Sequence, residues 1–210
     1  AVIESGVSGS NGGLFSIASN GEVTFDPNGE FDDLAGGETR QTSFTYTLVD
    51  ADGATDTATV TITVAGENDA TLTVGTIATR TNSDSDTITS LDVSGFFADA
   101  DFSDTLEYTA TGLPVGLTIN QSTGIISGTI DSSASASAPY TVEVTADDGI
   151  GGAVSQTFTW NVSNPGPDAV PDGFTANEDD LATVVGNAIT NNDGDPDGDS
   201  LNAIVESGVA

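Results

Sequence analysis

The 210-residue sequence contains no cysteine, histidine, lysine or methionine, and its basic residues are limited to Arg40 and Arg80. Without cysteine, neither disulfides nor thiolate metal sites can hold the chain together, which suits a protein that persists outside the cell without redox help. Zinc and copper lack good ligands here, whereas oxygen ligands for hard cations such as Ca²⁺ or Mg²⁺ are abundant. The absence of methionine, including at position 1, indicates an excised piece of a longer chain.

Positive charge is almost absent, whereas Asp and Glu total 33, so the net charge is −31. Such a surface makes nucleic acid and anionic membranes poor partners. No stretch of about 18 apolar residues is present, so membrane insertion is not predicted. No positively charged segment indicates a signal peptide. A hydrophobic fraction of 36%, with many β-branched residues, indicates a folded acidic protein rather than a disordered one.

Apolar and polar residues alternate with a period of two, which predicts strands throughout the chain. Residues 55–64, TDTATVTITV, place alanine, valine and isoleucine on one face and threonine on the other. Residues 43–49 alternate likewise, and the turn DADGA joins them to the first run as a predicted hairpin. Residues 140–146 and 155–162 repeat this design, with Trp160 facing inward. Since no run has a helical period, we predict an all-β protein built of β-sandwiches.

Two linker-like stretches, GENDA at 66–70 and SNPGPDAVPD at 163–172, divide the chain. The roughly 95 residues between them suit one complete β-sandwich. The predicted organisation has three parts: a C-terminal part of a sandwich at 1–67, a complete sandwich at 68–164, and a linker with the N-terminal part of the next sandwich at 165–210.

The two ends of the sequence repeat each other. Residues 4–7, ESGV, recur at 206–209, and the flanking alanine, valine and isoleucine residues agree as well. The repeat indicates a tandem array, in which residues 168–210 followed by 9–67 amount to one sandwich. We therefore expect the terminal parts to be complementary pieces of one domain type that can associate head to tail between molecules. The alternative is a chance match of four residues.

Three stretches resemble known repeat families. Residues 20–70, from NGEVTFDPNGEF to AGENDA, resemble the VCBS-type repeats of long bacterial surface proteins. Residues 96–130 and 139–149, FFADADFSDTLEY and onward to PYTVEVTADDG, are similar to dystroglycan-type cadherin-like domains. Residues 178–201, EDDLATVVGNAITNNDGDPDGDSL, are similar to the opening half of cadherin-like repeats. Such arrays form the extender regions of RTX-type adhesins on Gram-negative cell surfaces. The resemblance implies extracellular, tandem Greek-key β-sandwiches of the cadherin or Ig type in a string, stiffened by Ca²⁺.

Topology sorts the acidic residues by the end of the domain at which they lie. In a Greek-key sandwich the B–C and F–G loops cluster at the N-terminal end. In the middle domain these loops are DADFSD at 99–104 and DDG at 147–149. The stretch EFDDLAGGE at 30–38 should face the same linker from the preceding domain. These acidic clusters would converge on residues 67–69, and Ca²⁺ takes six to eight oxygen ligands.

The predicted metal ligands are thus short acidic or amide side chains in these turns and linkers, and the alternative for each is a turn residue that binds its own backbone. At the first junction they are Asp32, Asp33, Glu38, Glu67, Asn68, Asp69, Asp99, Asp101 and Asp147; at the second they are Asn164, Asp168, Asp195, Asp197 and Asp199. Secondary candidates are Asp84, Asp86, Glu178 and Asp179.

An EF-hand is not predicted. Residues 193–198 match the first half of such a loop, but Ile204 stands where a glutamate is needed, and no flanking helix is predicted.

These features predict a structural spacer in a bacterial surface adhesin, with Ca²⁺ stiffening its junctions and neighbouring repeats as its partners. An enzyme is not predicted. Without histidine or cysteine, catalysis would depend on paired carboxylates, and the carboxylates here lie in linker-like turns with few aromatic residues nearby. The alternative is a module that binds glycan or another surface through its threonine faces or Trp160. Threonine is ordinary on a solvent-facing strand, and Trp160 shares the face of Phe158 and Val162.

Overall fold

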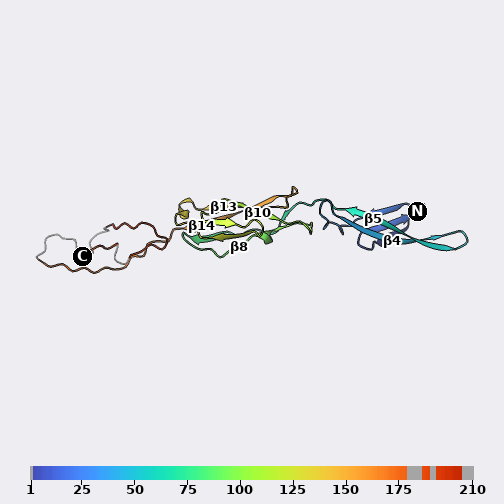
Figure 1. Cartoon of the computed structure of the whole chain (residues 1–210). Helices are drawn as coiled ribbons and strands as arrows, with labels where there is room; N and C mark the ends of the chain where they lie inside the picture. The colour runs from blue at the N-terminus through green and yellow to red at the C-terminus, as the bar shows by residue number, and fades with distance from the viewer. Residues whose placement is uncertain (1, 179–185, 190–192, 205–210) are drawn as a thin grey trace. The chain divides into compact units, whose positions relative to one another are not determined.

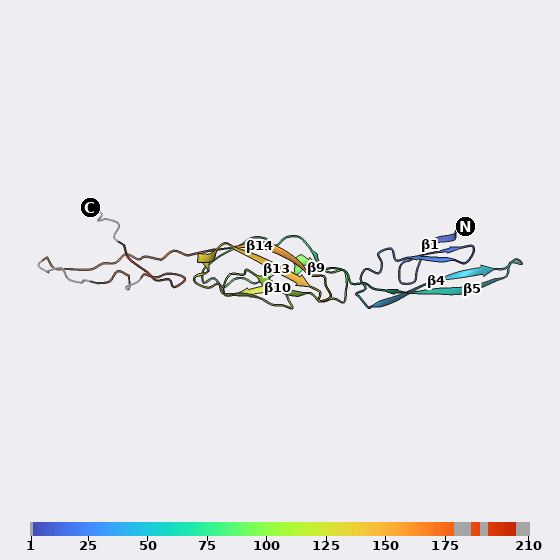
Figure 2. The same cartoon turned by 90° about the horizontal axis from the view of Figure 1, so that it is seen from above.

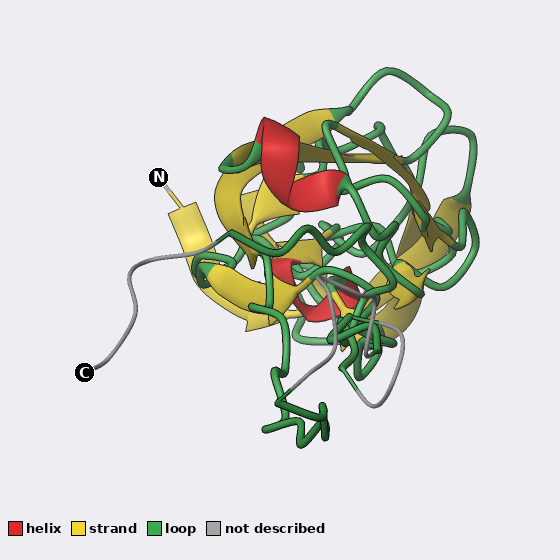
Figure 3. Ribbon diagram, turned by 90° about the vertical axis from the view of Figure 1, so that its left-hand side faces the viewer, coloured by secondary structure: helices red, strands yellow, loops and turns green. Residues whose placement is uncertain are grey.

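The computed structural model describes residues 2–178, 186–189 and 193–204, and these form strands, turns and loops. Helix in this part of the chain is limited to two 3₁₀ turns, η1 (Ser94–Phe96) and η2 (Ala134–Ser137), drawn in red in Figure 3. The all-β class predicted from the alternation of residues is confirmed. No helix among the described residues could cross a membrane.

The fold separates into two compact units. The first comprises residues 1–74, 95–107 and 146–154, and the second comprises residues 75–94, 108–145 and 155–210. The domain limits expected at 1–67, 68–164 and 165–210 stay a prediction. Asp179 and the repeated residues 206–209 lie outside the described residues.

The first unit contains a three-stranded antiparallel sheet and a long hairpin. The sheet has the order β1 (Val2–Ser8), β2 (Leu14–Ala18) and β3 (Val23–Asp26). The hairpin joins β4 (Thr39–Val49) to β5 (Thr55–Ala65), and the two strands pair along their full length (Figure 1). This confirms the predicted hairpin and extends its first strand back to Thr39. Two short strands, β6 (Leu72–Thr73) and β9 (Phe97–Ala98), also pair.

Aromatic side chains hold the first sandwich together. The ring of Phe15 in β2 is fully buried and lies 4.6 Å from that of Phe44 in β4 and 4.9 Å from that of Phe25 in β3, measured between centroids. The three-stranded sheet therefore packs on the hairpin through these rings, and offset or tilted aromatic pairs add to the stabilisation from burial.

The second unit contains most of two further sheets. One has the order β10 (Glu107–Thr111), β13 (Tyr140–Asp147), β14 (Val154–Ser163) and β7 (Arg80–Ser83) (Figure 2). The other has the order β11 (Leu117–Ile119), β12 (Ile125–Gly128) and β8 (Leu91–Asp92). β7 runs parallel to β14, with Trp160 opposite Arg80 and Ser163 opposite Ser83. The outer edge of the β13–β14 hairpin is therefore covered by a strand from earlier in the chain.

The inner face of β14 is buried as the sequence predicts. Phe158, Trp160 and Val162 are at most 7% exposed, and Val142 and Val144 of β13 are fully buried beside them. The indole Nε1–H of Trp160 donates to Oδ1 of Asn82 at 3.2 Å. Trp160 is thus a core residue with its polar atom satisfied.

We predict that Trp160→Ala lowers the free energy of unfolding of this sandwich by about 3–5 kcal/mol, because it removes a fully buried ring and leaves a cavity. Urea unfolding followed by circular dichroism measures the loss. Val115→Ala is the control: its side chain is 60% exposed, so the expected change stays within about 0.5 kcal/mol. Equal effects of the two substitutions would contradict the assignment of Trp160 to the core.

Candidate metal centres

The turn at residues 99–104 draws three carboxylates together. The backbone N–H of Asp101 donates to Oδ1 of Asp99 at 3.0 Å, and the hydroxyl of Thr71 donates to Oδ2 of Asp99 at 3.1 Å. Asp99, Asp101 and Asp104 each offer one carboxylate oxygen, and these atoms all lie within 4.8 Å of one another. Oxygens that share one Ca²⁺ at about 2.3–2.6 Å can be no farther apart than about 5 Å. The spacing therefore suits a shared cation.

The linker at residues 66–70 is bound to this turn and to the turn that begins at Asp147. The backbone N–H of Asp69 donates to Oδ2 of Asp101 at 2.8 Å. The side-chain amide of Asn68 donates to Oδ2 of Asp148 at 3.3 Å. Asp148 also accepts the backbone N–H groups of residues 150–152 at 2.7–3.1 Å, and these hydrogen bonds hold its pKa below the ordinary value.

Three buried oxygen atoms at this point accept no hydrogen bond from the described residues. They are Oδ1 of Asn68, Oδ1 of Asp101 and Oδ2 of Asp104. Asp101 as a whole is only 2% exposed. Burying a carboxylate or amide oxygen without a partner costs free energy. The cluster therefore offers oxygen ligands whose burial a bound cation would compensate.

The electrostatics of the cluster agree with this geometry. Burial raises the pKa of Asp104, and the negative charges of Asp101, Asp99, Asp148 and Glu38 raise it further. The folded chain therefore resists ionisation of Asp104 unless positive charge enters. Among the described residues, Arg40 forms an ion pair with Asp33 at 2.5 Å. No basic side chain of the described residues forms an ion pair with the cluster.

The acidic residues of the stretch at 30–38 make different contacts. The carboxylate of Asp33 is held by Arg40, whose hydrogen bond lowers its pKa, while its backbone carbonyl accepts the N–H of Phe102 at 3.2 Å. Glu38 accepts the N–H of Ala35 at 3.2 Å and is near enough to Asp104 to raise its pKa. Three of the predicted ligands line one hollow of about 300 Å³: Asp32, Glu67 and Asp69.

A second cluster lies in the second unit. Asp195, Asp197 and Asp199 again offer oxygens within 4.8 Å of one another. Asp195 accepts the backbone N–H groups of Asp197 and Asp199, both at 3.2 Å, so the turn folds around its carboxylate. Asp197 is 8% exposed, and neither of its carboxylate oxygens has a hydrogen-bond partner among the described residues. Its pKa is raised, first by the side chain of Asp195 and then by burial.

Other residues of the second unit border this turn. Asp168 and Gly194 exchange backbone hydrogen bonds at 2.8 and 3.1 Å, which places the linker residue beside the turn. The hydroxyl of Ser85 donates to the carbonyl of Asp197 at 3.5 Å. Its neighbour in the chain, Asp84, is 3% exposed. Its Oδ1 accepts the N–H of Ser135 at 2.8 Å, and its Oδ2 has no hydrogen-bond partner in the described part of the chain. Asn164, predicted as a ligand here, is exposed.

The structure adds two residues to those selected from the sequence and gives more weight to a third. Asp104 and Asp148 stand in the predicted turns but were not selected, whereas the exposed Asp147 accepts only the N–H of Gly149 in the recorded hydrogen bonds. Asp84 was only a secondary candidate. The sequence could have indicated Asp104 as a ligand, because it belongs to the same D-x-D-x-x-D run as Asp99 and Asp101. Nothing in the local sequence distinguishes Asp148 from Asp147.

Paired β-sheets around an aromatic core, with acidic turns gathered at the linkers, define a β-sandwich protein. Residues 1–66 match the family model of the bacterial cadherin-like domain, and residues 70–163 match that of a putative Ig domain. The first segment is thus similar to bacterial cadherin-like domains, and the second is similar to Ig-like domains. None of the curated proteins compared with the sequence matches it.

Several solved structures are similar to parts of the chain. Protocadherin gammaB7 EC3-6 is 14% identical with a TM-score of 0.49, and the match covers 80% of this chain and 44% of that one. Mouse cadherin-23 EC22-24 is 13% identical with a TM-score of 0.42, covering 71% and 48%. A putative alpha-galactosidase from Bacteroides fragilis is 19% identical with a TM-score of 0.34, covering 45% and 19%. The chain spans less than half the length of each of these solved structures. Its assignment as a β-sandwich protein rests on the family models and on its own sheets.

Domains of these classes are typically non-enzymatic structural modules, and neither matched family is a catalytic one. Cadherin-like domains are extracellular and generally bind Ca²⁺, and the described residues contain two acidic clusters of suitable composition. Trp160, considered from the sequence as a sugar platform, is fully buried.

We predict that Asp104→Asn stabilises the protein in EDTA near neutral pH and has little effect near pH 4. The folded-state pKa of Asp104 is raised above 3.8, so its favourable contribution is present below that value and is lost as pH rises through the raised pKa. Asp33 and Asp148, whose pKa values are lowered, change the stability in a separate pH range below 3.8. Thermal melts in EDTA at several pH values measure the effect, and an identical gain at both ends of the range would contradict it.

Proposed function

We propose that this chain is a spacer segment of a large bacterial surface adhesin, in which Ca²⁺ bound at the linkers stiffens the string of sandwiches that projects a distal binding domain. The observation that carries the proposal is the group of buried, unpartnered oxygens on Asn68, Asp101 and Asp104 beside the linker. An ordinary solvated loop would leave these atoms in water, where they cost nothing.

The first centre would be held by oxygen ligands from the linker and from the turn that follows it in the second domain match. Asp99, Asp101 and Asp104 supply carboxylates from one turn, and Asn68 supplies its amide oxygen from the linker itself. Ligands of this hard, all-oxygen kind favour Ca²⁺ over transition metals. Carboxylates of Glu38 and Asp148 stand nearby and add negative potential.

The second centre would be held by Asp195, Asp197 and Asp199, with Asp84 as a further donor from the preceding sandwich. Its unpartnered atoms are those of Asp197 and Asp84. Because the first centre would join a linker residue to a later turn, and the second would join residues on both sides of a linker, binding there would favour one arrangement of the chain.

The bound ion would supply positive charge that the chain lacks. Without it, like charges at contact distance near a protein surface repel by on the order of several kcal/mol, and the linker would be freer to bend. With it, the hydrogen bond from Asp69 to Asp101 and that from Asn68 to Asp148 would be kept. Extracellular modules that bind Ca²⁺ with Kd values of about 10⁻⁴–10⁻³ M remain loaded at millimolar Ca²⁺.

We predict that Ca²⁺ raises the melting temperature of the chain and that EDTA reverses the change. An ion that binds only the folded state stabilises it by about 2.7 kcal/mol when its free concentration is a hundredfold above Kd. Differential scanning calorimetry across a Ca²⁺ series, with Mg²⁺ as the control cation, tests this. A melting temperature that does not respond to Ca²⁺ would mean that the acidic turns are solvated loops that bind no Ca²⁺.

We also predict that Asp101→Asn weakens Ca²⁺ binding at the first centre by about tenfold or more, because it removes a buried ligand charge. Asp197→Asn should do the same at the second centre and leave the first intact. Asp56→Asn is the matched control, since Asp56 is exposed on β5 and outside both clusters. Isothermal titration calorimetry gives affinity and stoichiometry, and small-angle X-ray scattering shows whether Ca²⁺ extends the chain. Full binding by Asp101→Asn would rule out the first centre.

A further inference from the structure

Thr71 is a buried polar residue beside the first metal centre. It follows the linker directly, and 3% of its surface is exposed. Its hydroxyl donates to Oδ2 of Asp99 at 3.1 Å across 28 positions of the chain. Burying a hydroxyl without a partner costs free energy, so this hydrogen bond keeps the two side chains together. Thr71 is not one of the predicted metal ligands, and it carries no charge.

The carboxylate of Asp99 is held at both of its oxygen atoms. Oδ1 accepts the backbone N–H of Asp101 at 3.0 Å, and Oδ2 accepts the hydroxyl of Thr71. An ionised carboxylate offers about four lone-pair sites, so each oxygen keeps the capacity to bind a cation as well. Two donors on different oxygens fix the rotation of the carboxylate. Thr71 therefore sets the direction in which Asp99 presents its remaining lone pairs.

The same stretch of chain also holds the next ligand in the turn. The backbone N–H of Asp69, two residues before Thr71, donates to Oδ2 of Asp101 at 2.8 Å. The other oxygen of Asp101, Oδ1, is buried and has no hydrogen-bond partner among the described residues. Asp69 and Thr71 thus each hold one oxygen of a different carboxylate, and the unpartnered oxygen of Asp101 is left for a cation.

Close backbone packing fixes Thr71 relative to the turn. Gly152 is buried, and an added Cβ there would lie 2.9 Å from the backbone nitrogen of Thr71. A side chain does not fit at this point, so the backbone after β13 approaches Thr71 directly. β6 begins at the residue after Thr71 and pairs with β9, which ends one residue before Asp99. The distance between Thr71 and Asp99 is therefore set by a strand pair.

We infer that Thr71 is a positioning residue of the first metal centre, where its hydroxyl holds the carboxylate of Asp99 in the orientation that binds Ca²⁺. The inference rests on the function proposed above, because it assigns a role at a centre that Ca²⁺ would occupy. Loss of a hydrogen bond that orients a ligand typically lowers metal affinity by about 10–100-fold. Thr71 also joins the end of the linker to a ligand, so it couples occupancy of the centre to the linker.

Two effects of the hydroxyl oppose each other, and their balance decides the sign of the result. In the metal-free chain the hydroxyl stabilises the ionised carboxylate of Asp99, so its removal by itself would raise the affinity for a cation. In the loaded chain the hydroxyl keeps the carboxylate aligned, so its removal would lower the affinity. A positioning role requires the second effect to be the larger.

The test measures Ca²⁺ affinity by isothermal titration calorimetry on the full chain. All variants are made in an Asp197→Asn parent chain, so that the first centre is titrated alone. Thr71→Val removes the hydroxyl and keeps the size of the side chain, and it is expected to weaken Ca²⁺ binding by about tenfold or more. Thr71→Ser keeps a hydroxyl and should restore most of the affinity. Circular dichroism and thermal melts in EDTA confirm that each variant is folded.

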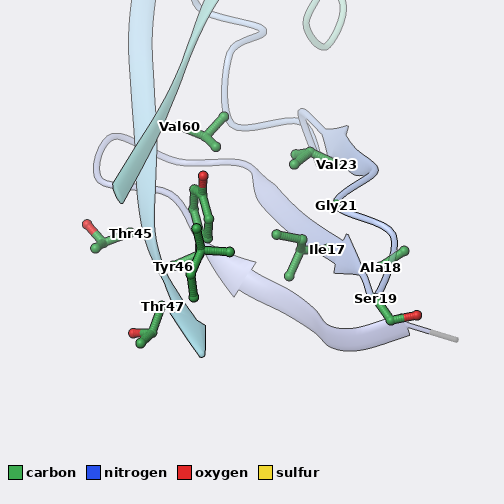
Figure 4. Close-up of a pocket in the computed structure, with 10 residues that line it drawn as sticks. Ile17, Ala18, Ser19, Gly21, Val23, Thr45, Tyr46, Thr47 and Val60 are labelled. Carbon is green, nitrogen blue, oxygen red and sulfur yellow. The ribbon is translucent and has the colours of Figure 1, made fainter. Parts of the chain in front are cut away.

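Two threonines of the first sandwich serve as controls. Thr42→Val removes a hydroxyl that is equally buried, since Thr42 is 1% exposed and donates to the carbonyl of Gly12 at 2.8 Å. Thr45→Val places valine at an exposed position of β4 (Figure 4), where the hydroxyl shares a hydrogen bond with that of Thr59. Both variants should bind Ca²⁺ as the parent chain does, because neither hydroxyl bonds a residue of the first centre.

A second readout needs no Ca²⁺ and tests whether Thr71 acts through Asp99. In EDTA, hydrogen exchange of the Asp101 amide should be faster in Thr71→Val than in the parent chain or Thr71→Ser, because the carboxylate that accepts this N–H is no longer held. The amide of Gly13 is the control, since it also donates to a carboxylate, that of Glu30, at 3.0 Å. Its exchange should stay unchanged.

The outcomes separate this inference from the proposed function. A parent chain that binds no Ca²⁺ would overturn the proposed function at this centre, and the inference with it. A parent chain that binds Ca²⁺ while Thr71→Val binds it equally or more tightly would overturn the inference alone. The same conclusion would follow if Thr71→Ser or Thr42→Val lost as much affinity as Thr71→Val, or if exchange of the Asp101 amide did not change.

Discussion

Negative charge that the chain's own cations do not neutralise is the constraint on which the structure depends. The chain has 33 acidic residues and two arginines, and Arg40 is already engaged by Asp33. The strands accommodate this excess by keeping carboxylates off their inner faces, so the acidic residues collect in turns at the ends of the sandwiches. The linkers run through the same places. Negative charge is thus concentrated at the linkers, where a cation would bind under the function proposed above.

The two long hairpins show how one local design acquires different roles. Both alternate apolar and hydroxyl residues and both end at a linker. β14 is covered on its outer edge by β7, and its face carries the buried Trp160. β5 has a free outer edge among the described residues, and a hollow lined by Ile17, Tyr46 and Val60 lies open beside it (Figure 4). The difference lies not in the strand sequences but in what other segments are available to pack against them.

The candidate centres could be predicted in outline because turn position follows from strand order. The alternation located the hairpins, and the hairpins placed the turns at 99–104 and 147–149 beside the linker. The choice between Asp147 and Asp148 could not be made this way, since adjacent residues in a turn point in different directions. Asp148 meets Asn68, eighty residues away in the chain. Asp84 was underestimated because its burial comes from contacts such as that with Ser135.

The sequence by itself determined the all-β class, the two hairpins, the inward face of Trp160 and the end of the domain at which the acids gather. These follow from period-two alternation and turn chemistry, which act between near neighbours. Only the tertiary structure decided which oxygens are buried without partners, as in Asp101, Asp104 and Asp197, and which strand edge stays open. Burial and hydrogen bonding of those atoms depend on residues distant in sequence, and short-range patterns carry no information about such contacts.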